Sequence, residues 1–480
     1  MSPFDKARYT RLLEGLEASE VPSVKVILGT PTGRFDAEYF GKQYLRDEMV
    51  VGARAKDFCT LASMNLKVDA SAFYPSIEQY YGEGSLPFLR VADVGIHIDW
   101  EACTSIPADL CNQYPTLSMV QPGDILLTKG GSIARVGITT YKAAASRDLI
   151  FINSSLLAEQ DQHFLYLYFQ SGFFNRLLIR SSSQTAQPHL TITLVRDLPI
   201  LSASDTFKAH LSKFVKRAFL AHNTSLAHAA SAESKLVDTL GLGTWTPPEA
   251  LSYVRSNSEA FAAKRLDAEH FKPRIAALLE LLNATGQAQP LSEVMAFNQR
   301  GQQPTYCENG LPVINSKHVN RGEVRLDDDN RVATFDEKTP LIQPGDVLMN
   351  GTGVGTIGRS APYLHQTPAI PDNHVTILRP KPGIDPVYLS VFLNSIAGQI
   401  QVEQWQRGSS GQIELYPDDI ARFLVWVAPT STQRSVKQAI ESSFQEKQRS
   451  TMLLDAACRA VEIAIENSEA AAMDYLETQG

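Results

Sequence analysis

The chain has 480 residues, of which 44% are apolar and 9% aromatic, and its formal net charge is −8 at pH 7. This length and apolar content predict a folded protein of several domains and exclude a largely disordered chain. Residues 1–20 are charged and lack an apolar core, and no apolar run approaches the roughly 20 residues of a membrane-spanning helix. We therefore expect a cytoplasmic protein without a membrane segment.

Cysteine and histidine patterns give no sign of a structural metal. The five cysteines are odd in number, widely spaced and free of the CxxC spacing. They are therefore expected to be packing residues, not members of a disulfide framework or a zinc site. His189 and His374 lack a companion histidine or carboxylate at ligand spacing, so ordinary hydrogen bonding is expected of both.

The first element of the chain after residue 33 is copied later in the sequence. Residues 34–40, RFDAEYF, recur as residues 265–271, RLDAEHF. The other copied pairs are Leu86-Pro87 with Leu311-Pro312, Gln121-Pro-Gly-Asp124 with Gln343-Pro-Gly-Asp346, and Gln187 with Gln412. A solenoid repeats every 20 to 50 residues or so, which makes two pseudo-symmetric halves the better interpretation. In each copy we expect the arginine to pair with an acid and the aromatic residue to anchor the domain to its helix.

The first repeated domain, residues 34–205, is predicted to be α+β. Short β-rich runs bounded by turn residues predict strands at 88–91, 124–127 and 148–152. A helix is expected over residues 161–178. Residues 1–33 form an N-terminal extension.

A central helical spacer is predicted over residues 206–290. Asp205 and Thr206 are suited to cap a helix whose apolar positions, beginning at Phe207 and Leu211, repeat at helical spacing as far as Leu240. Residues 241–248 contain glycines and prolines and predict a hinge. A second helical stretch is expected over residues 259–282.

The second repeated domain covers residues 291–430, with strands predicted at 346–349 and 374–378 and a helix at 386–400. Residues 431–480 are expected to form a helix with a weak heptad pattern, packed against the first long helix. Core-facing amphipathic helices would show similar stripes, but the repetition favours a central pair. The expected fold class is α+β, with two pseudo-symmetric α/β domains separated by long antiparallel helices.

Residues 121–137 and 343–359 each predict a turn, a strand, a glycine-rich turn and a second strand. The second copy contains a formal GxGxxG at residues 353–358. A dinucleotide-binding fingerprint must open a helix, and the residues after 358 do not favour one. We therefore do not expect nucleotide binding at this motif.

The order of these motifs, found twice over residues 34–465, resembles the specificity subunit of type I restriction-modification systems. The resemblance implies two target-recognition domains, each reading half of a split sequence in double-stranded DNA. It implies that the helical spacer sets the gap between half-sites and docks methyltransferase subunits, in two copies, with restriction or motor subunits as further partners. Catalysis would belong to those partners, and with it S-adenosylmethionine, ATP and Mg²⁺. The sequence agrees, because it has neither a Walker A loop nor an Asn/Asp-Pro-Pro-aromatic methyltransferase motif.

The chemistry of base recognition suggests which residues touch DNA. Arginine and lysine suit guanine edges and phosphates, and asparagine and glutamine suit adenine. The candidates, in or beside the matched turns and polar loops, are Arg90, Lys129, Arg135, Arg180, Gln184, Gln187, Lys317, Asn350, Arg359, Arg407 and Gln412. Each would also be explained as a solvated loop residue or, for Arg90 and Lys317, as a charge at a strand end.

The acidic balance leaves two rival interpretations open. Acidic residues outnumber basic ones in both repeated domains, so any DNA contact must use a local basic patch, with partners supplying further positive charge. One rival is a specificity-like recognition or scaffold subunit of another anti-phage defence assembly. The other is a nuclease or transferase built from the glycine-rich loop and scattered acids. The copied acids Asp36-Ala-Glu38 and Asp267-Ala-Glu269 have no Lys in their motifs and are not expected to be catalytic.

Overall fold

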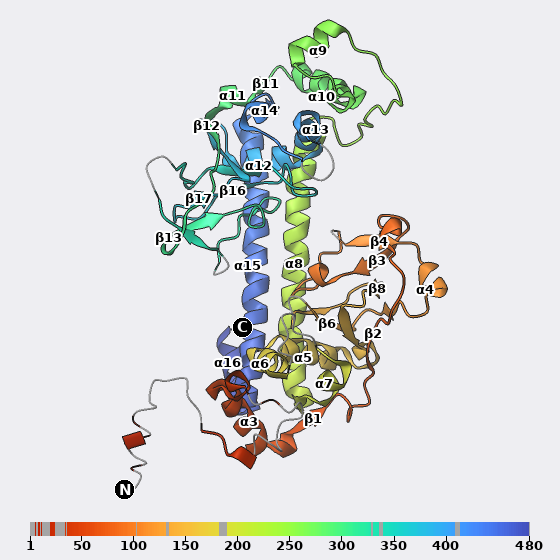
Figure 1. Cartoon of the computed structure of the whole chain (residues 1–480), viewed down its shortest axis with the longest axis vertical. Helices are drawn as coiled ribbons and strands as arrows, with labels where there is room; N and C mark the ends of the chain where they lie inside the picture. Colours follow the sequence, from red (N-terminus) through yellow and green to blue (C-terminus); the bar gives the residue numbers. More distant parts are fainter. Residues whose placement is uncertain are drawn as a thin grey trace. The chain divides into compact units, whose positions relative to one another are not determined.

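The computed structural model describes residues 34, 36–101, 103–130, 134–181, 190–327, 330–335, 339–408 and 413–479, and of the first 24 residues only 5, 8, 9, 11 and 20–24 (Figure 1). The chain divides into two units. Unit 1 comprises residues 1–220 and 449–480, and unit 2 comprises residues 221–448. Two long helices, α8 (Asp205–Thr239) and α15 (Thr430–Glu466), each contribute residues to both units.

The strands described in unit 1 form two four-stranded sheets and one strand pair. The first sheet, antiparallel throughout, has the order β2 (Val68–Ala70), β9 (Leu149–Ile152), β6 (Ile125–Thr128) and β7 (Val136–Ile138). The second has the order β4 (Thr104–Ile106), β3 (Leu86–Leu89), β8 (Ala143–Ala145) and β5 (Met119–Val120), with β3 and β8 parallel. β1 (Phe58–Thr60) pairs with β10 (Pro199–Leu201).

Unit 2 repeats this arrangement. Its antiparallel sheet has the order β12 (Met295–Arg300), β18 (Val375–Pro380), β15 (Val347–Asn350) and β16 (Ser360–Pro362). A smaller sheet has the order β14 (Val332–Ala333), β13 (Tyr306–Ile314) and β17 (Ile370–Pro371), with β13 and β17 parallel. β11 (Ala288–Pro290) pairs with β19 (Leu424–Trp426). The predicted strands are all present, within two residues of the expected bounds, and the duplication extends to the strand order.

The copied Gln-Pro-Gly-Asp motif makes the same turn in both units. The N–H of Gln121 donates to Asp124 Oδ2 at 2.7 Å, and the N–H of Gln343 donates to Asp346 Oδ2 at 2.7 Å. The glycine has φ +92 in the first turn and +90 in the second, a region that glycine enters without steric cost. Each turn leads directly into the central strand of its sheet, β6 or β15.

The helices predicted at 161–178 and 386–400 are each two helices. These are α5 (Glu159–Gln170) and α6 (Gly172–Ser181) in unit 1, and α12 (Pro386–Asn394) and α13 (Ile396–Trp405) in unit 2. A serine with extended backbone separates each pair, and its hydroxyl donates to the carbonyl three residues earlier, at 2.6 Å for Ser171 and 2.7 Å for Ser395. Such a local bond competes with the helical ladder and ends the first helix.

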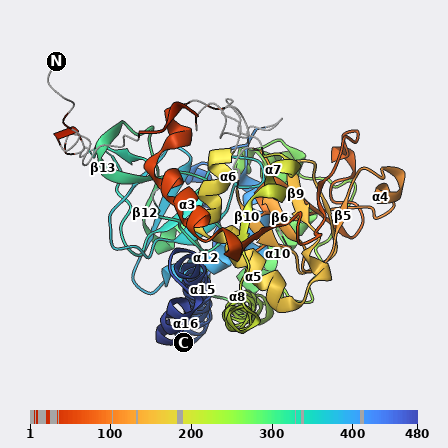
Figure 2. The same cartoon turned by 90° about the horizontal axis from the view of Figure 1, so that it is seen from below.

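The long helices pack together within each unit. In unit 1, Leu211 and Val215 of α8 share a core with Val461 of α15, and Figures 1 and 2 show these stretches side by side. In unit 2, the hydroxyls of Ser225 and Ser443 lie 3.0 Å apart. The two helices run in opposite directions, which confirms the predicted antiparallel packing. The N-terminal cap of α8 lies one residue before the predicted one, because Ser204 Oγ accepts from the N–H of Phe207 at 3.3 Å.

The helical stretch predicted at 259–282 is interrupted by the copied motif itself. It consists of α9 (Asn257–Ala263), the 3-10 helix η6 (Ala268–Phe271) and α10 (Pro273–Ala284). Its counterpart in unit 1 is η1 (Ala37–Phe40) followed by α3 (Lys42–Ala53). The other helices whose bounds lie within the described residues 34–479 are α4 (Leu110–Gln113), α7 (Ile192–Asp197), α11 (Leu291–Val294), α14 (Pro417–Ile420) and α16 (Glu469–Gln479), with short 3-10 turns η2 (Ala55–Asp57), η3 (Glu78–Tyr80), η4 (Val91–Asp93) and η5 (Ser154–Leu156).

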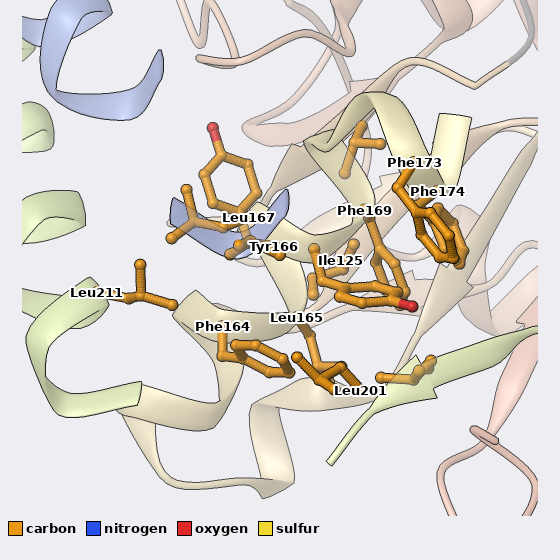
Figure 3. Packing of buried hydrophobic residues seen from close by; sticks show 14 of the residues in the cluster. Ile125, Phe164, Leu165, Tyr166, Leu167, Phe169, Phe173, Phe174, Leu201 and Leu211 are labelled. Carbon is orange, nitrogen blue, oxygen red and sulfur yellow. The ribbon is translucent and has the colours of Figure 1, made fainter. Parts of the chain in front are cut away.

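The main core of unit 1 is aromatic. Figure 3 shows Phe164 and Phe169 of α5 and Phe174 of α6 packed among aliphatic side chains, including Ile125 of β6. The rings of Phe169 and Phe174 have centroids 4.5 Å apart. The strand that leads into the glycine-rich turn, β6, therefore packs one face into this core, and Leu126 on its other face belongs to a second buried cluster. Within the described residues, no helix is both long and apolar enough to span a bilayer, and all five cysteines are free.

Candidate nucleic-acid interface

The copied arginines tie the start of each unit to the end of a helix. Arg34 donates from Nε and Nη2 to Asp36 at 2.7 Å each, and from Nη1 to the carbonyl of Arg180 at 2.8 Å. Arg265 makes the same fork to Asp267 at 2.6 and 3.0 Å and reaches the carbonyl of Gln406 at 3.0 Å. The expected pairing of this arginine with an acid is confirmed in both units.

These forks also change the ionisation of the acids. Hydrogen bonding from Arg34 lowers the pKa of Asp36, and hydrogen bonding from Arg265 lowers the pKa of Asp267. Both carboxylates are therefore ionised and engaged at neutral pH. They are structural anchors, and a general acid would need the opposite shift.

The glycine-rich turn of unit 1 holds two cations. Lys129 follows β6 and Arg135 precedes β7, with residues 131–133 outside the described part of the chain. The N–H of Thr128 donates to the carbonyl of Arg135 at 3.0 Å, which closes the turn. Arg135 is exposed and Lys129 half-buried, and neither side chain has a hydrogen bond or ion pair to a described residue. Both ammonium and guanidinium groups are therefore free to meet a phosphate or a base edge.

The corresponding turn of unit 2 ends in Arg359. Here the N–H of Asn350 donates to the carbonyl of Arg359 at 2.9 Å, the same bond that joins Thr128 to Arg135. Arg135 and Arg359 are therefore structural equivalents. The guanidinium of Arg359 is half-buried and has no partner among the described residues. β16 follows the GxGxxG motif, so the expectation that this motif does not open a dinucleotide-binding helix is confirmed.

Asn350 corrects one prediction. Its side chain is 0% exposed, and its Nδ2 donates to the carbonyls of Ser316 at 3.0 Å and Val319 at 3.2 Å. A side chain inside the fold cannot read an adenine edge. Asn350 closes β15 against a neighbouring segment, and its position at the end of a buried strand explains why.

Backbone bonds hold the second turn against a neighbouring loop. Gly351 accepts from the N–H of Leu415 at 2.8 Å and donates to the carbonyl of His374 at 2.8 Å. His374 Nδ1 lies 2.8 Å from Thr352 Oγ1. The ordinary hydrogen bonding expected of His374 is confirmed, and the turn is a fixed part of the surface.

Arg407 lies beside this turn and is partly engaged. It is exposed, and its Nη2 donates to Asp419 Oδ1 at 2.6 Å, a bond that raises the pKa of Arg407. Its guanidinium is 5.9 Å from the ring of Tyr416, and that of Arg300 is 5.6 Å from the same ring. Arg300 and Tyr416 were not predicted, because residue 300 and the segment 407–416 are far apart in the chain and meet only in the folded unit. An exposed tyrosine flanked by two arginines is suited to stack on a base or sugar.

The other predicted residues differ in how available they are. Lys317 is exposed, and its ammonium has no partner among the described residues, whereas Arg90 pairs with Asp93 at 3.3 Å. Arg180 is 10% exposed, donates to the carbonyl of Tyr39 at 2.9 Å and lies 4.3 Å from that ring. Its guanidinium holds the copied N-terminal motif in place, which makes it a poorer DNA candidate than the exposed cations. Gln184, Gln187, Gln412 and His189 lie outside the described residues.

Acidic groups near the surface do not converge on a reactive centre. In the described part of the chain, no group of three or more His, Cys, Asp and Glu is arranged to hold a metal ion. Burial raises the pKa of Asp372, whose Oδ1 accepts from the N–H of His374 at 2.8 Å. This acid shapes the start of β18, and no nucleophile among the described residues is bonded to it.

No family model and no curated protein matches the sequence. Among solved structures, the chain is similar to the S subunit of the type I restriction-modification system from M. genitalium, with 13% identity over 85% of this chain and 94% of the other, and a TM-score of 0.37. It is also similar to a chain from a study of the assembly and conformational transition of the type I R-M system, with 12% identity over 84% and 98% and a TM-score of 0.29. A third similar structure is the HsdS subunit from Thermoanaerobacter tengcongensis, with 13% identity over 73% and 82% and a TM-score of 0.23. Because these identities and TM-scores are low, we draw no functional conclusion from the likeness.

Proposed function

We propose that this chain is the DNA-specificity subunit of a restriction-modification complex and is itself non-catalytic. Each unit reads one half of a bipartite target in double-stranded DNA. The observation that carries the proposal is the equivalence of Arg135 and Arg359. The same hairpin presents these two arginines in two copies of one fold, and neither guanidinium has a partner among the described residues. Two equivalent hairpins that each present an arginine suit a DNA target with two half-sites. The order of the copied motifs, which resembles that of type I specificity subunits, supports the same function.

Electrostatics limits how strongly such a chain would bind DNA alone. The net charge is −8, so the long-range field repels a polyanion, and only local cations attract phosphates. Among the predicted residues that the structure describes, unit 1 offers Lys129 and Arg135, and unit 2 offers Lys317, Arg359 and Arg407, the last already bonded to Asp419. With so few phosphate contacts, high affinity requires positive charge from partner subunits.

The partners we propose are methyltransferase subunits, two in number, with restriction or motor subunits added in a cleaving complex. They would bring S-adenosylmethionine, ATP and Mg²⁺. Exposed apolar side chains on the long helices would help to dock them, namely Leu220 and Leu226 on α8 and Met452 on α15. We propose a cytoplasmic location, where such a complex meets the genome.

The first test is a genome-wide methylation map of cells with and without the gene, with the neighbouring methyltransferase gene unchanged. We expect a split motif that disappears with the gene. If no motif changes, the chain is a scaffold or belongs to an assembly that does not methylate DNA.

A second test assigns the half-sites. Arg359→Ala should relax one base position in one half-site and Arg135→Ala one position in the other, each by about 1–3 kcal/mol of discrimination. Arg325→Ala is the matched control, because its guanidinium is exposed in unit 2 but already paired with Asp327 at 2.9 Å. Equal weakening of both half-sites by either variant would contradict the assignment. If the purified chain alone cleaved or modified DNA, and the substitution of a single carboxylate abolished this activity, the chain would be an enzyme and the proposal would be wrong.

A further inference from the structure

Unit 1 contains a cavity of about 510 Å³ that adjoins the glycine-rich turn, because the N–H of Lys129 donates to the carbonyl of Asp148 in the cavity lining at 2.9 Å. It is formed by residues 73–81, by the end of β3 with the turn after it, and by the turn before β9. Its lining includes Phe73, Glu78, Tyr81, Ser146, Arg147 and Asp148. This volume falls within the roughly 300–1,000 Å³ of small-molecule sites. The proposed function leaves the cavity without a role.

The apolar part of the lining is aromatic and incompletely covered. Phe73 is 78% exposed, although it borders a cavity. Tyr81 is half-buried, with its ring 5.7 Å from that of Phe88 and the guanidinium of Arg90 5.8 Å from it. Flat aromatic faces of this kind are the surfaces on which proteins stack unpaired bases.

The polar part of the lining contains a buried group without a partner. Ser146 is 6% exposed, and its Oγ has no hydrogen bond within the described structure. Its N–H donates to the carbonyl of Leu89 and its own carbonyl accepts from Leu149, so only the hydroxyl is unsatisfied. Buried hydroxyls nearly always have a partner. The Oγ itself has less than 1 Å² of accessible surface, so a ligand would supply the partner only after the Ser146 side chain rotates toward the cavity, where the hydroxyl can both donate and accept.

The charged groups indicate what kind of ligand this is. Arg147 is exposed, and its guanidinium makes no hydrogen bond or ion pair with a described residue. The carboxylates of Glu78 and Asp148 have no ion-pair partner in the same part of the chain. A guanidinium suits a phosphate, and a carboxylate accepts from an exocyclic amino group of a base.

We propose that this cavity binds a nucleobase that carries a phosphate and an exocyclic amino group, as in adenine, cytosine or guanine nucleotides. The base stacks on Phe73 or Tyr81, Ser146 hydrogen-bonds to its edge, a carboxylate accepts from its amino group, and Arg147 meets the phosphate. The source is either a free nucleotide or an unstacked base of a DNA strand. Only the second source rests on the proposed function.

The experiment uses the purified full-length chain and isothermal titration calorimetry. The probes are dAMP, dCMP and dTMP, a short single-stranded oligonucleotide of mixed sequence, and the same oligonucleotide with one abasic position. We expect dAMP or dCMP to bind several-fold more tightly than dTMP if the source is a free nucleotide. If the source is a strand, the intact oligonucleotide binds about tenfold more tightly than the abasic one and monophosphates bind weakly.

Three variants separate the site from the fold. Phe73→Ala should weaken binding of the preferred probe about tenfold, whereas Phe261→Ala, a phenylalanine of unit 2 with a similar exposure of 75%, should leave it unchanged. Ser146→Ala should weaken it several-fold without lowering the melting temperature, because the hydroxyl has no partner in the fold. Absence of binding by every probe, or equal binding by Phe73→Ala and the unmodified chain, would overturn the inference. Because these readouts use neither a bipartite target nor methylation, the inference and the proposed function fail separately.

Discussion

Replacing Arg265 with alanine should destabilise unit 2 by much more than its ion pair alone would suggest. The side chain is 11% exposed, forks onto Asp267 and also reaches the backbone carbonyls of Trp405 and Gln406 at 3.4 and 3.0 Å. These carbonyls end α13, so the guanidinium joins the segment before α10 to the helix pair of the unit. Truncation removes this donor from both carbonyls and leaves the Asp267 carboxylate with only the N–H of His270, at 3.1 Å.

The size of the effect follows from these contacts. The Arg265–Asp267 pair is partly exposed and contributes about 1 kcal/mol or less. Hydrogen bonds from a charged donor contribute about 1.5–3 kcal/mol each, less for the long bond to Trp405. We therefore expect Arg265→Ala to lower the free energy of unfolding by about 2–4 kcal/mol. Arg265→Lys should recover only part of it, because an ammonium cannot reproduce the planar fork.

Arg325 provides an internal control. It pairs with Asp327 two residues later, as Arg265 does with Asp267, but it is exposed and bonds no helix end. Arg325→Ala should cost about 0–1 kcal/mol. Urea unfolding, together with hydrogen exchange over residues 257–284 to localise the loss, compares the two variants. Equal losses would refute the claim that the helix carbonyls carry the effect.

The pH dependence of stability provides a second test of the role assigned to Arg265. Hydrogen bonding from Arg265 lowers the folded-state pKa of Asp267 below its unfolded value of about 3.9. The stability that the ionised Asp267 contributes is therefore fully present above its unfolded pKa, and it is lost as pH falls through the lower pKa of the folded state. The stability gap between the unmodified chain and Arg265→Ala should narrow only at the acid end of the titration.

Three further predictions concern the fold around the candidate interface. Asn350→Ala should lower the stability of unit 2 by about 1–3 kcal/mol, and Asn350→Asp by more, since two carbonyls lose their donor; unchanged urea midpoints would contradict this. Gly358→Ala should lower the melting temperature more than Gly355→Ala, because both have φ near +78 but a Cβ at Gly358 would lie 2.6 Å from Val402 and one at Gly355 meets nothing within 4 Å; similar losses would indicate backbone strain alone. Burial lowers the pKa of His163 to about 4, so this histidine should cost the chain about 3 kcal/mol of stability as pH falls from about 6.5 to about 4. His163→Gln should remove that part of the slope in denaturation measured across this range, while the part from His270, whose pKa burial also lowers, remains.

Much of the fold was predictable because its sequence motifs occur twice in the chain. Two copies of Gln-Pro-Gly-Asp predicted two turns leading into strands, and both are present with matching φ values. The helix breaks at Ser171 and Ser395 were not predicted. Both segments keep an apolar pattern across the break, and a serine hydroxyl bonded to a nearby carbonyl leaves no mark in that pattern.

Residues of the candidate interface were predictable only where their position in the sequence pattern determined whether the side chain is exposed. Arg135 and Arg359 flank turns, and turns lie at the surface, so their availability followed from the pattern. Asn350 also flanks a turn but ends a buried strand, and nothing local distinguishes a side chain that points inward from one that points outward there. Arg300 and Tyr416 meet only in the folded unit, so one sequence without relatives gives no sign of their contact.

The β6–β7 hairpin of unit 1 and the β15–β16 hairpin of unit 2 share their backbone hydrogen bonding but differ in the residues of their turns. This difference bears on which bases each hairpin would recognise. An arginine stands at the equivalent position of the corresponding sheet in each unit. The carbonyl of Arg135 accepts from Thr128 in unit 1, and the carbonyl of Arg359 accepts from Asn350 in unit 2. The turn between them is longer in unit 2, and the residue after the strand is Lys129 in one copy and Gly351 in the other. A recognition element needs a rigid frame to hold its donors and variable side chains to choose among bases. Two copies with a shared frame and unlike turns fit the proposed reading of two different half-sites. A scaffold would have no need of an arginine at the same place twice, with no side-chain partner among the described residues.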